Sequence, residues 1–451
     1  MNEHPSGAEI AALLQDGLAS DRRSAILFHL LRPCAECLAQ APLQIRALLK
    51  FEGEPTNGAQ EDADLDSAID RALRVARRHE KHLQRQRQEA KRAGEILDQG
   101  GMEAAENFPT DLGDLAAMEA LLARSWAVRH ENPNLMSQLA FLAVKRAERL
   151  DARTYGIEQV YDFKCRAEAE LGNAYRVIDQ LSAARATLGH ARHLFELGTG
   201  NELLDVRLLS LEASLDADLR DFNAACMRLT RAYQIYLRLG DRHLAGRTLV
   251  KKGLFTSDSG RDKEALDILK KSLTLIDHQK DPSLVFAANL NVLLILVDLG
   301  DFDAAKMQLF LLRPFQPYSG GRINELRLRC LEARIDAGLE KFSRAEEVFR
   351  EVRDGFLGLN RAYDSALASL DLAAALLSQK KARETTEVVT AAHKVFTSLG
   401  IQREAMMTLS LLRTACQAHM ATPEMIEEIA RFLRRLQIDP NARYEGQALK
   451  R

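Results

Sequence analysis

The sequence predicts an all-α fold built from stacked helical hairpins. Ala, Leu, Arg, Glu, Lys and Gln dominate the chain, and all of them favour helices. Apolar residues recur with i, i+3, i+4 spacing, and no stretch alternates with the period of two that indicates a strand. The 451 residues include only 11 prolines and 25 glycines, too few for the frequent turns of an all-β protein.

Composition excludes several classes of protein. The 62 basic and 64 acidic residues give a net charge of −2, so no overall field attracts nucleic acid or a membrane surface. No apolar run approaches the roughly 18 residues of a membrane span, and the N-terminus lacks the pattern of a secretory signal. Six cysteines in a chain of this length make no disulfide framework. We therefore expect a cytoplasmic protein without a membrane segment.

Four regions succeed one another along the chain. Residues 1–50 show short helical patterns around a His/Cys cluster, and residues 51–113 form a linker that contains one charged helix at 64–99. Residues 114–421 show a long helical array, and residues 422–451 form a last helix and a loose tail. Thr422 is the expected N-cap of that helix, with proline at its first position, which is a common way for a helix to begin.

The array is periodic, with a repeat of 40 or 41 residues. A small residue recurs at the anchor positions Ala184, Ala225, Ala265, Ala305, Ala345 and Thr385. Four residues later the same phase holds Leu188, Leu229, Leu269, Leu309, Phe349 and Val389. Twelve residues before each anchor lie Gly172, Ala213, Gly253, Leu293, Ala333 and Ala373. Small residues allow two helices to approach closely, and large ones fill the space between hairpins, so neighbouring hairpins must stack.

The best unit resembles a tetratricopeptide repeat, on the positions Leu171, Gly172, Tyr175, Ala184, Leu188 and Ala191. Two segments, 220–225 and 300–305, resemble the turn of that family between its helices. The period departs from the family's value of about 34, and the family's Trp and trailing Pro are mostly missing. The resemblance implies a right-handed superhelix whose concave groove, lined by the first helix of each hairpin, binds a segment of another protein.

Counting back from the anchors places two columns on that groove. The first holds Arg166, Arg207, Arg247, Ala287 and Arg327, and the second holds Asn173, Ser214, Leu254, Leu294 and Arg334. Guanidinium groups bind carboxylates with two parallel hydrogen bonds, so we expect an acidic or C-terminal peptide as the partner. Leu254, Leu290 and Leu294 make the middle of the groove apolar, which suits an amphipathic helix. The alternative is that the arginines are solvated or pair with carboxylates of neighbouring helices.

A His/Cys cluster near the N-terminus has the residue types of a metal site. His29, Cys34 and Cys37 would supply three of the four ligands that Zn²⁺ prefers, and no fourth ligand is evident. The stretch resembles the zinc-binding anti-sigma domain of bacteria, although the gap between His29 and Cys34 is one residue longer. The resemblance implies a sigma factor as a partner. The alternatives are a redox-active cysteine pair and two ordinary buried cysteines.

Metal analysis of protein purified without added zinc tests this site. Bound Zn²⁺ predicts close to one equivalent per chain, because the thiolates hold the metal during purification. Less than about a tenth of an equivalent would rule out a zinc site.

One predicted helix is strongly basic. Residues 71–92 hold nine basic and two acidic residues, including Arg74, Arg77, Arg78, Lys81 and Arg85. Such a helix cannot lie in a core. Contact with nucleic acid phosphates or an acidic protein is one interpretation, and a solvated connecting helix is the other.

Motifs for catalysis are missing from the sequence. It has no Gly-rich phosphate loop, no Gly-x-Ser-x-Gly and no His-Glu-x-x-His. We expect a non-enzymatic bacterial adaptor or regulator that captures a partner polypeptide in its groove, with a sigma factor or a signalling effector as candidate targets. The alternatives are a nucleic-acid-associated regulator that uses the basic helix, and a pure scaffold whose N-terminal cysteines are vestigial.

Overall fold

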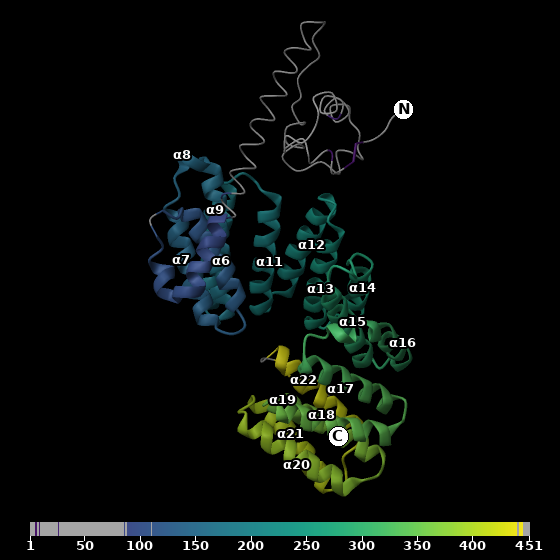
Figure 1. Cartoon of the computed structure of the whole chain (residues 1–451). Helices are drawn as coiled ribbons and strands as arrows, with labels where there is room; N and C mark the ends of the chain where they lie inside the picture. The colour runs from purple at the N-terminus through teal and green to yellow at the C-terminus, as the bar shows by residue number, and fades with distance from the viewer. Residues whose placement is uncertain are drawn as a thin grey trace. The chain divides into compact units, whose positions relative to one another are not determined.

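The computed structural model describes residues 5, 6, 9, 26, 85, 88–109, 111–439 and 442–444. The described residues are largely helical and contain no strand, so the predicted all-α fold is confirmed (Figure 1). The chain divides into two compact units, Met1–Thr199 and Gly200–Arg451.

The first unit holds five helices of the array and a helical stretch before them. The helices are α6 (Asp114–Val128), α7 (Pro133–Glu148), α8 (Ala152–Tyr155), α9 (Ile157–Val177) and α10 (Leu181–Glu196). Residues 88–106 are also helical, so the helix predicted to end at residue 99 continues for seven residues. Its extension is stabilised by Ala105, which is buried in the same core as Phe108, Leu121 and Ala140.

The described part of the second unit contains six successive pairs of helices. They are α11 (Glu202–Asp218) with α12 (Phe222–Arg238), α13 (Arg242–Asp258) with α14 (Asp262–Leu273), α15 (Pro282–Asp298) with α16 (Phe302–Leu312), α17 (Arg322–Gly338) with α18 (Phe342–Gly358), α19 (Ala362–Ser378) with α20 (Ala382–Ser398), and α21 (Arg403–Gln417) with α22 (Pro423–Ile438). The 3₁₀ helix η1 (Arg313–Tyr318) comes directly after α16. The first helices of the first five hairpins begin 40 residues apart, as the periodicity predicts.

Most helices are joined by three residues, and the turn between α15 and α16 shows how. Gly300 has a φ of 76°, and its N–H donates to the Val297 carbonyl while the Asp301 N–H donates to the Leu296 carbonyl. Asp301 then accepts a hydrogen bond from the Ala304 N–H and so caps the next helix. Other turns hold a residue other than glycine in the same left-handed conformation: Arg220, Glu340, Asn360 and Lys380.

The periodic columns form the core. All six anchor residues are buried, from Ala184 to Thr385, and so are the residues twelve positions before them. The close approach is clearest at Gly253 in α13, where a Cβ atom would lie 2.7 Å from Leu269 Cγ in α14. The small residues are therefore required by the packing of the two helices in each hairpin.

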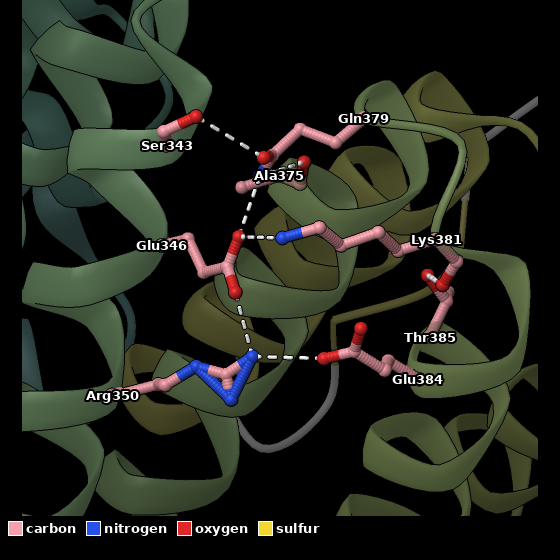
Figure 2. Close-up of polar contacts among 8 residues, drawn as sticks. All are labelled: Ser343, Glu346, Arg350, Ala375, Gln379, Lys381, Glu384 and Thr385. Carbon is pink, nitrogen blue, oxygen red and sulfur yellow. Dashed lines mark hydrogen bonds and ion pairs between the residues drawn. The ribbon is translucent and has the colours of Figure 1, made fainter.

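A polar network joins α18, α19 and α20 around Glu346 (Figure 2). The carboxylate accepts hydrogen bonds from Lys381 Nζ (2.7 Å), Gln379 Nε2 (2.8 Å) and Arg350 Nη2 (2.6 Å). Arg350 also pairs with Glu384 Oε2 at 3.0 Å. Burial acts to raise the pKa of Glu346, but the hydrogen bonds from Lys381 and Gln379 and the charges of Lys381 and Arg350 outweigh it and hold the pKa below its ordinary value.

Replacing Glu346 with Gln should lower the free energy of unfolding at neutral pH by about 1–2 kcal/mol, because cationic donors lose their anionic acceptor. A carboxylate whose pKa is lower in the folded state stabilises the fold at pH values above its pKa in the unfolded state. This stabilisation is lost as the pH falls through the pKa of the folded state. The difference in the free energy of unfolding between wild type and Glu346→Gln should therefore become smaller at acidic pH. Urea unfolding at several pH values measures it. The exposed neighbour Glu347 provides the control, Glu347→Gln, and an equal effect of both variants would contradict the prediction.

The last helix belongs to the core of the second unit. Thr422 caps α22 as predicted, accepting a hydrogen bond from the Met425 N–H. Instead of pairing mainly with α21, α22 packs on α19, with Ile426, Ile429 and Leu433 fully buried. This helix, which follows the predicted boundary at residue 421, therefore packs with a helix of the array.

The tail after α22 is ordered in its described part, whereas the sequence predicts a loose tail. The Tyr444 ring packs against the Phe432 ring with centroids 5.4 Å apart, and the Tyr444 N–H donates to Glu404 Oε1 at 3.1 Å. Ala442 is buried in the same core. An aromatic pair and a charged acceptor hold this segment, and neither was evident from the segment's polar composition.

Candidate partner-binding face

A cavity of about 340 Å³ lies among α15, α17, α19 and α22 in the second unit. Four residues that the sequence predicts for partner binding line it together: Leu290 and Leu294 from α15, and Arg327 and Arg334 from α17. They share this cavity because α15 and α17 are the first helices of consecutive hairpins, so the same repeat phase points their side chains to the same side.

Two ion pairs lie in the lining of the cavity. Arg334 Nη2 lies 2.8 Å from Asp298 Oδ1, and Arg434 of α22 pairs with Asp371 of α19. Burial acts against the charged form of Arg434, but the charge of Asp371 and its hydrogen bond outweigh burial and raise the pKa of Arg434. These pairs neutralise their own charges, so neither arginine is available as an unpaired cation for a partner.

Cys330 lies beside the pair of Arg434 and Asp371. Its Sγ atom lies 3.8 Å from Asp371 Oδ2. Burial, with the nearby Asp371 charge, raises the pKa of the Cys330 thiol to about 12. The thiol is therefore neutral at physiological pH and contributes to the cavity as a small apolar group.

The rim of the cavity is different in character. Arg327 is exposed and donates to Asn324 Oδ1 at 3.4 Å, and among the described residues no carboxylate lies within ion-pair distance of it. Gln437 Nε2 donates to Asp364 Oδ1 at 3.2 Å on another part of the lining. The apolar residues that line the cavity are Leu290, Leu294, Leu331, Phe356, Leu367, Ala368 and Ile438. The cavity can hold an apolar group, with one cation at its edge for a carboxylate.

The sequence reasoning missed the contribution of α22. Arg434, Gln437 and Ile438 line the cavity although the last helix was predicted to lie outside the array. A signal was present at Asp371, a lone carboxylate in the apolar run ASLDLAAALL, because a buried carboxylate needs a cation. The sequence could not show that the cation comes from 63 residues further along the chain.

Three other predicted residues of the second unit lie away from this cavity. Burial and Asp241 raise the pKa of Tyr236, while Arg247 and Arg207 act to lower it, so both arginines lie near that ring. Arg247 is exposed, and Arg207 and Leu254 are half-buried. None of the three lines the cavity.

Two predicted residues belong to the first unit. Arg166 Nη1 pairs with Glu119 Oε1 at 2.5 Å, as the alternative interpretation of the arginines expects. Asn173 is 3% exposed, and its Oδ1 accepts hydrogen bonds from Arg176. The side chain of Asn173 is therefore packed beside Arg176, and its contact with a partner stays a prediction.

The remaining predicted sites lie largely outside the described residues. This holds for His29, Cys34 and Cys37, and for Arg74, Arg77, Arg78 and Lys81. Arg85 is described, and its Nε pairs with Glu89 Oε1, four residues further along the chain, at 2.8 Å. In the described part of the chain, no group of three or more His, Cys, Asp or Glu could hold a metal ion. No helix in that part is long and apolar enough to span a bilayer.

Comparison with known proteins identifies the fold. No protein-family model matches the sequence, and no curated protein matches it. Among solved structures, a signal transduction ATPase with numerous domains and a tetratricopeptide repeat sensor, from Pyrococcus horikoshii, is similar with a TM-score of 0.52 and 13% identity. The match covers 88% of this chain and 54% of that one. Aspartyl phosphate phosphatase F from Bacillus subtilis matches with a TM-score of 0.48 and 13% identity, over 88% of this chain and 96% of that one.

These similarities concern the fold. At 13% identity, the likeness to the repeat sensor shows that the chain has tetratricopeptide-type helical hairpins and shows nothing of its partner. The fold, together with the cavity on its first helices, is the basis for a functional proposal.

Proposed function

We propose that this protein is a non-enzymatic adaptor or regulator that captures a partner polypeptide on the first helices of its second unit. The observation that carries the proposal is the cavity among α15, α17, α19 and α22, which collects Leu290, Leu294, Arg327 and Arg334. Tetratricopeptide-type hairpins offer such a face to other chains because each first helix presents its residues in the same phase.

The lining favours a partner of particular chemistry. An apolar side chain of the partner would fill the space beside Leu290 and Leu294, and a carboxylate would reach the exposed guanidinium of Arg327. Apolar anchors in pockets supply most of the binding energy at such interfaces, while a charge at the rim mainly affects orientation and association rate. An amphipathic segment with an acidic residue beside its apolar anchor fits these requirements. We place this activity in the cytoplasm, and a sigma factor or a signalling effector would be a suitable class of partner.

Site-specific photo-crosslinking tests this proposal. The full chain, carrying p-benzoylphenylalanine in place of Leu294, should form a discrete covalent adduct with a protein of its native cells. The Arg327→Glu variant should reduce that adduct, because it replaces the cation proposed for the partner's carboxylate with an anion. Arg327 is exposed, so we expect its replacement to leave the fold intact.

The same crosslinker in place of Leu357 is the matched control, because Leu357 is exposed on α18 and does not line the cavity. Equal adducts from both positions, or none from position 294, would contradict the proposal.

A further inference from the structure

Helix α16 exposes a stripe of three large apolar side chains. Met307, Phe310 and Leu311 are 63%, 64% and 53% exposed. Their spacing of three and four residues places them on one face of the helix. The opposite face, with Ala305, Gln308 and Leu312, is buried in the core, so α16 is apolar on a side that ordinary packing does not use.

The repeat itself provides a comparison for this stripe. The same positions, two, five and six residues after each anchor, hold different side chains in the other units: Ala186, Gly189 and His190; Met227, Thr230 and Arg231; Asp267, Lys270 and Lys271; Glu347, Arg350 and Glu351; Glu387, Thr390 and Ala391. At most one large apolar residue occurs in each of these sets. The stripe on α16 is therefore not a requirement of the hairpin.

The stack of hairpins also changes beside α16. The chain takes nine residues, 313–321, to reach α17, whereas most connections take three. α16 packs only lightly against α17, and a hollow of about 390 Å³ lies beside it. Leu309 and Phe310 line this hollow from α16, and Ile335 and Leu339 line it from α17 and its C-terminal end. Phe310 thus belongs both to the exposed stripe and to the hollow.

The charges around the hollow are mostly positive. Its lining includes five cations, Lys306, Arg313, Arg329, Lys341 and Arg344, against two carboxylates, Glu332 and Asp336. Arg329 pairs with Glu332 and Glu351, and both Lys341 and Arg344 pair with Asp336. Among the described residues, no carboxylate lies within ion-pair distance of Lys306 or Arg313, which lie close to the stripe in sequence.

We propose that the stripe Met307, Phe310 and Leu311, with this hollow, is a second interaction surface that binds an acidic amphipathic helix of a partner protein. Exposed clusters of apolar side chains mark interaction sites, and the surplus of cations selects a partner whose polar face is acidic. This surface shares no residue with the cavity on α15, α17, α19 and α22. It would let the protein hold two chains at once.

A defined probe tests the surface: a fluorescein-labelled synthetic helix with Leu on one face and Glu on the other, titrated with the full chain by fluorescence anisotropy. We expect saturable binding that Phe310→Gln weakens by about tenfold or more, because the central apolar contact is lost. Arg313→Glu should weaken binding and reduce its salt dependence. Thr390→Gln, at the same repeat position on α20, should bind as wild type. Leu294→Gln, in the cavity, identifies any part of the binding that occurs at that other site, and Phe310→Gln should weaken the binding that remains.

Each of the following results would overturn this proposal. The first is no binding of the probe by the wild-type chain, or equal binding by wild type and Phe310→Gln. The second is loss of binding in Leu294→Gln alone, which would place the helix in the other cavity and support the proposed function instead. The third is a dimer in sedimentation velocity that Phe310→Gln dissociates, which would show that a second copy covers the stripe. If a probe with Lys in place of Glu binds as tightly as the Glu probe, the surface does not select an acidic partner.

Discussion

Replacing Asp371 with Ala is expected to lower the free energy of unfolding of the second unit by about 3–5 kcal/mol, because it leaves Arg434, whose side chain is only 21% exposed, without its partner. Asp371 is 8% exposed, and it is the residue on α19 that pairs with Arg434 of α22. The variant should also loosen α22, whose polar contacts with α19 include this pair and the hydrogen bond from Tyr363 Oη to the Leu433 carbonyl. Hydrogen exchange of α22 and urea unfolding measure the two effects.

A double variant separates the cost of the unpaired charge from the value of the pair. Asp371→Leu combined with Arg434→Met removes both charges and keeps similar volumes, so most of the lost stability should return. Glu351→Ala is the control for an exposed pair, since Glu351 is half exposed in its contact with Arg329. Its effect should stay below about 1 kcal/mol. A loss no larger in Asp371→Ala than in Glu351→Ala would contradict the prediction.

Replacing Phe349 with Ala should lower the free energy of unfolding by about 3–5 kcal/mol, because it opens a cavity in the core. Phe349 is 1% exposed and occupies the large-residue position four residues after the anchor Ala345. It packs in α18 with Val352, Leu372 and Leu376, which come from the same helix and from α19. Circular dichroism during urea unfolding measures the change.

Leu357 lies on the same helix and provides the matched control. It is 60% exposed, so Leu357→Ala should change stability by less than about 0.5 kcal/mol. In a repeat array each hairpin is stabilised mainly by its neighbours, so Phe349→Ala should unfold α17–α20 in a separate transition. An effect of Phe349→Ala equal to that of Leu357→Ala would show that the periodic column does not carry the core.

The core was predictable because the pattern of small and large residues that forms it lies within each hairpin and repeats about every 40 residues. The anchor position, held by Ala305 in α16, is buried in every unit, so the period shows which side chains are buried even where the residue type changes to Thr385. The left-handed turn residues were less evident. Gly300 signals such a turn, but Glu340 and Lys380 adopt the same conformation without glycine, because the helices on both sides fix the turn.

The candidate site was predictable only in part, because some of its residues follow from the repeat and others come from a helix that does not follow it. The repeat phase placed Leu290, Leu294, Arg327 and Arg334 on one face, since all four follow the repeat pattern. The repeat pattern does not predict the contacts of α22, because this helix packs on α19 rather than continuing the order of the preceding hairpins. The partner of a lone charge such as Asp371 depends on the path of the chain through space, which a periodic pattern does not contain.

The constant spacing of the helices has a consequence for how this chain can change during evolution. In the hairpins from α13 to α16, a shorter second helix is compensated by a longer connection, so each helix with its connection still occupies 20 residues. Duplication of a 40-residue gene segment, cut at any three-residue turn, would add one hairpin and leave every later side chain facing the same way. Insertion of a single residue within a helix would rotate the remainder of that helix by about 100° and turn its buried face outward. Selection can therefore lengthen or shorten this array in whole units far more easily than it can edit one helix.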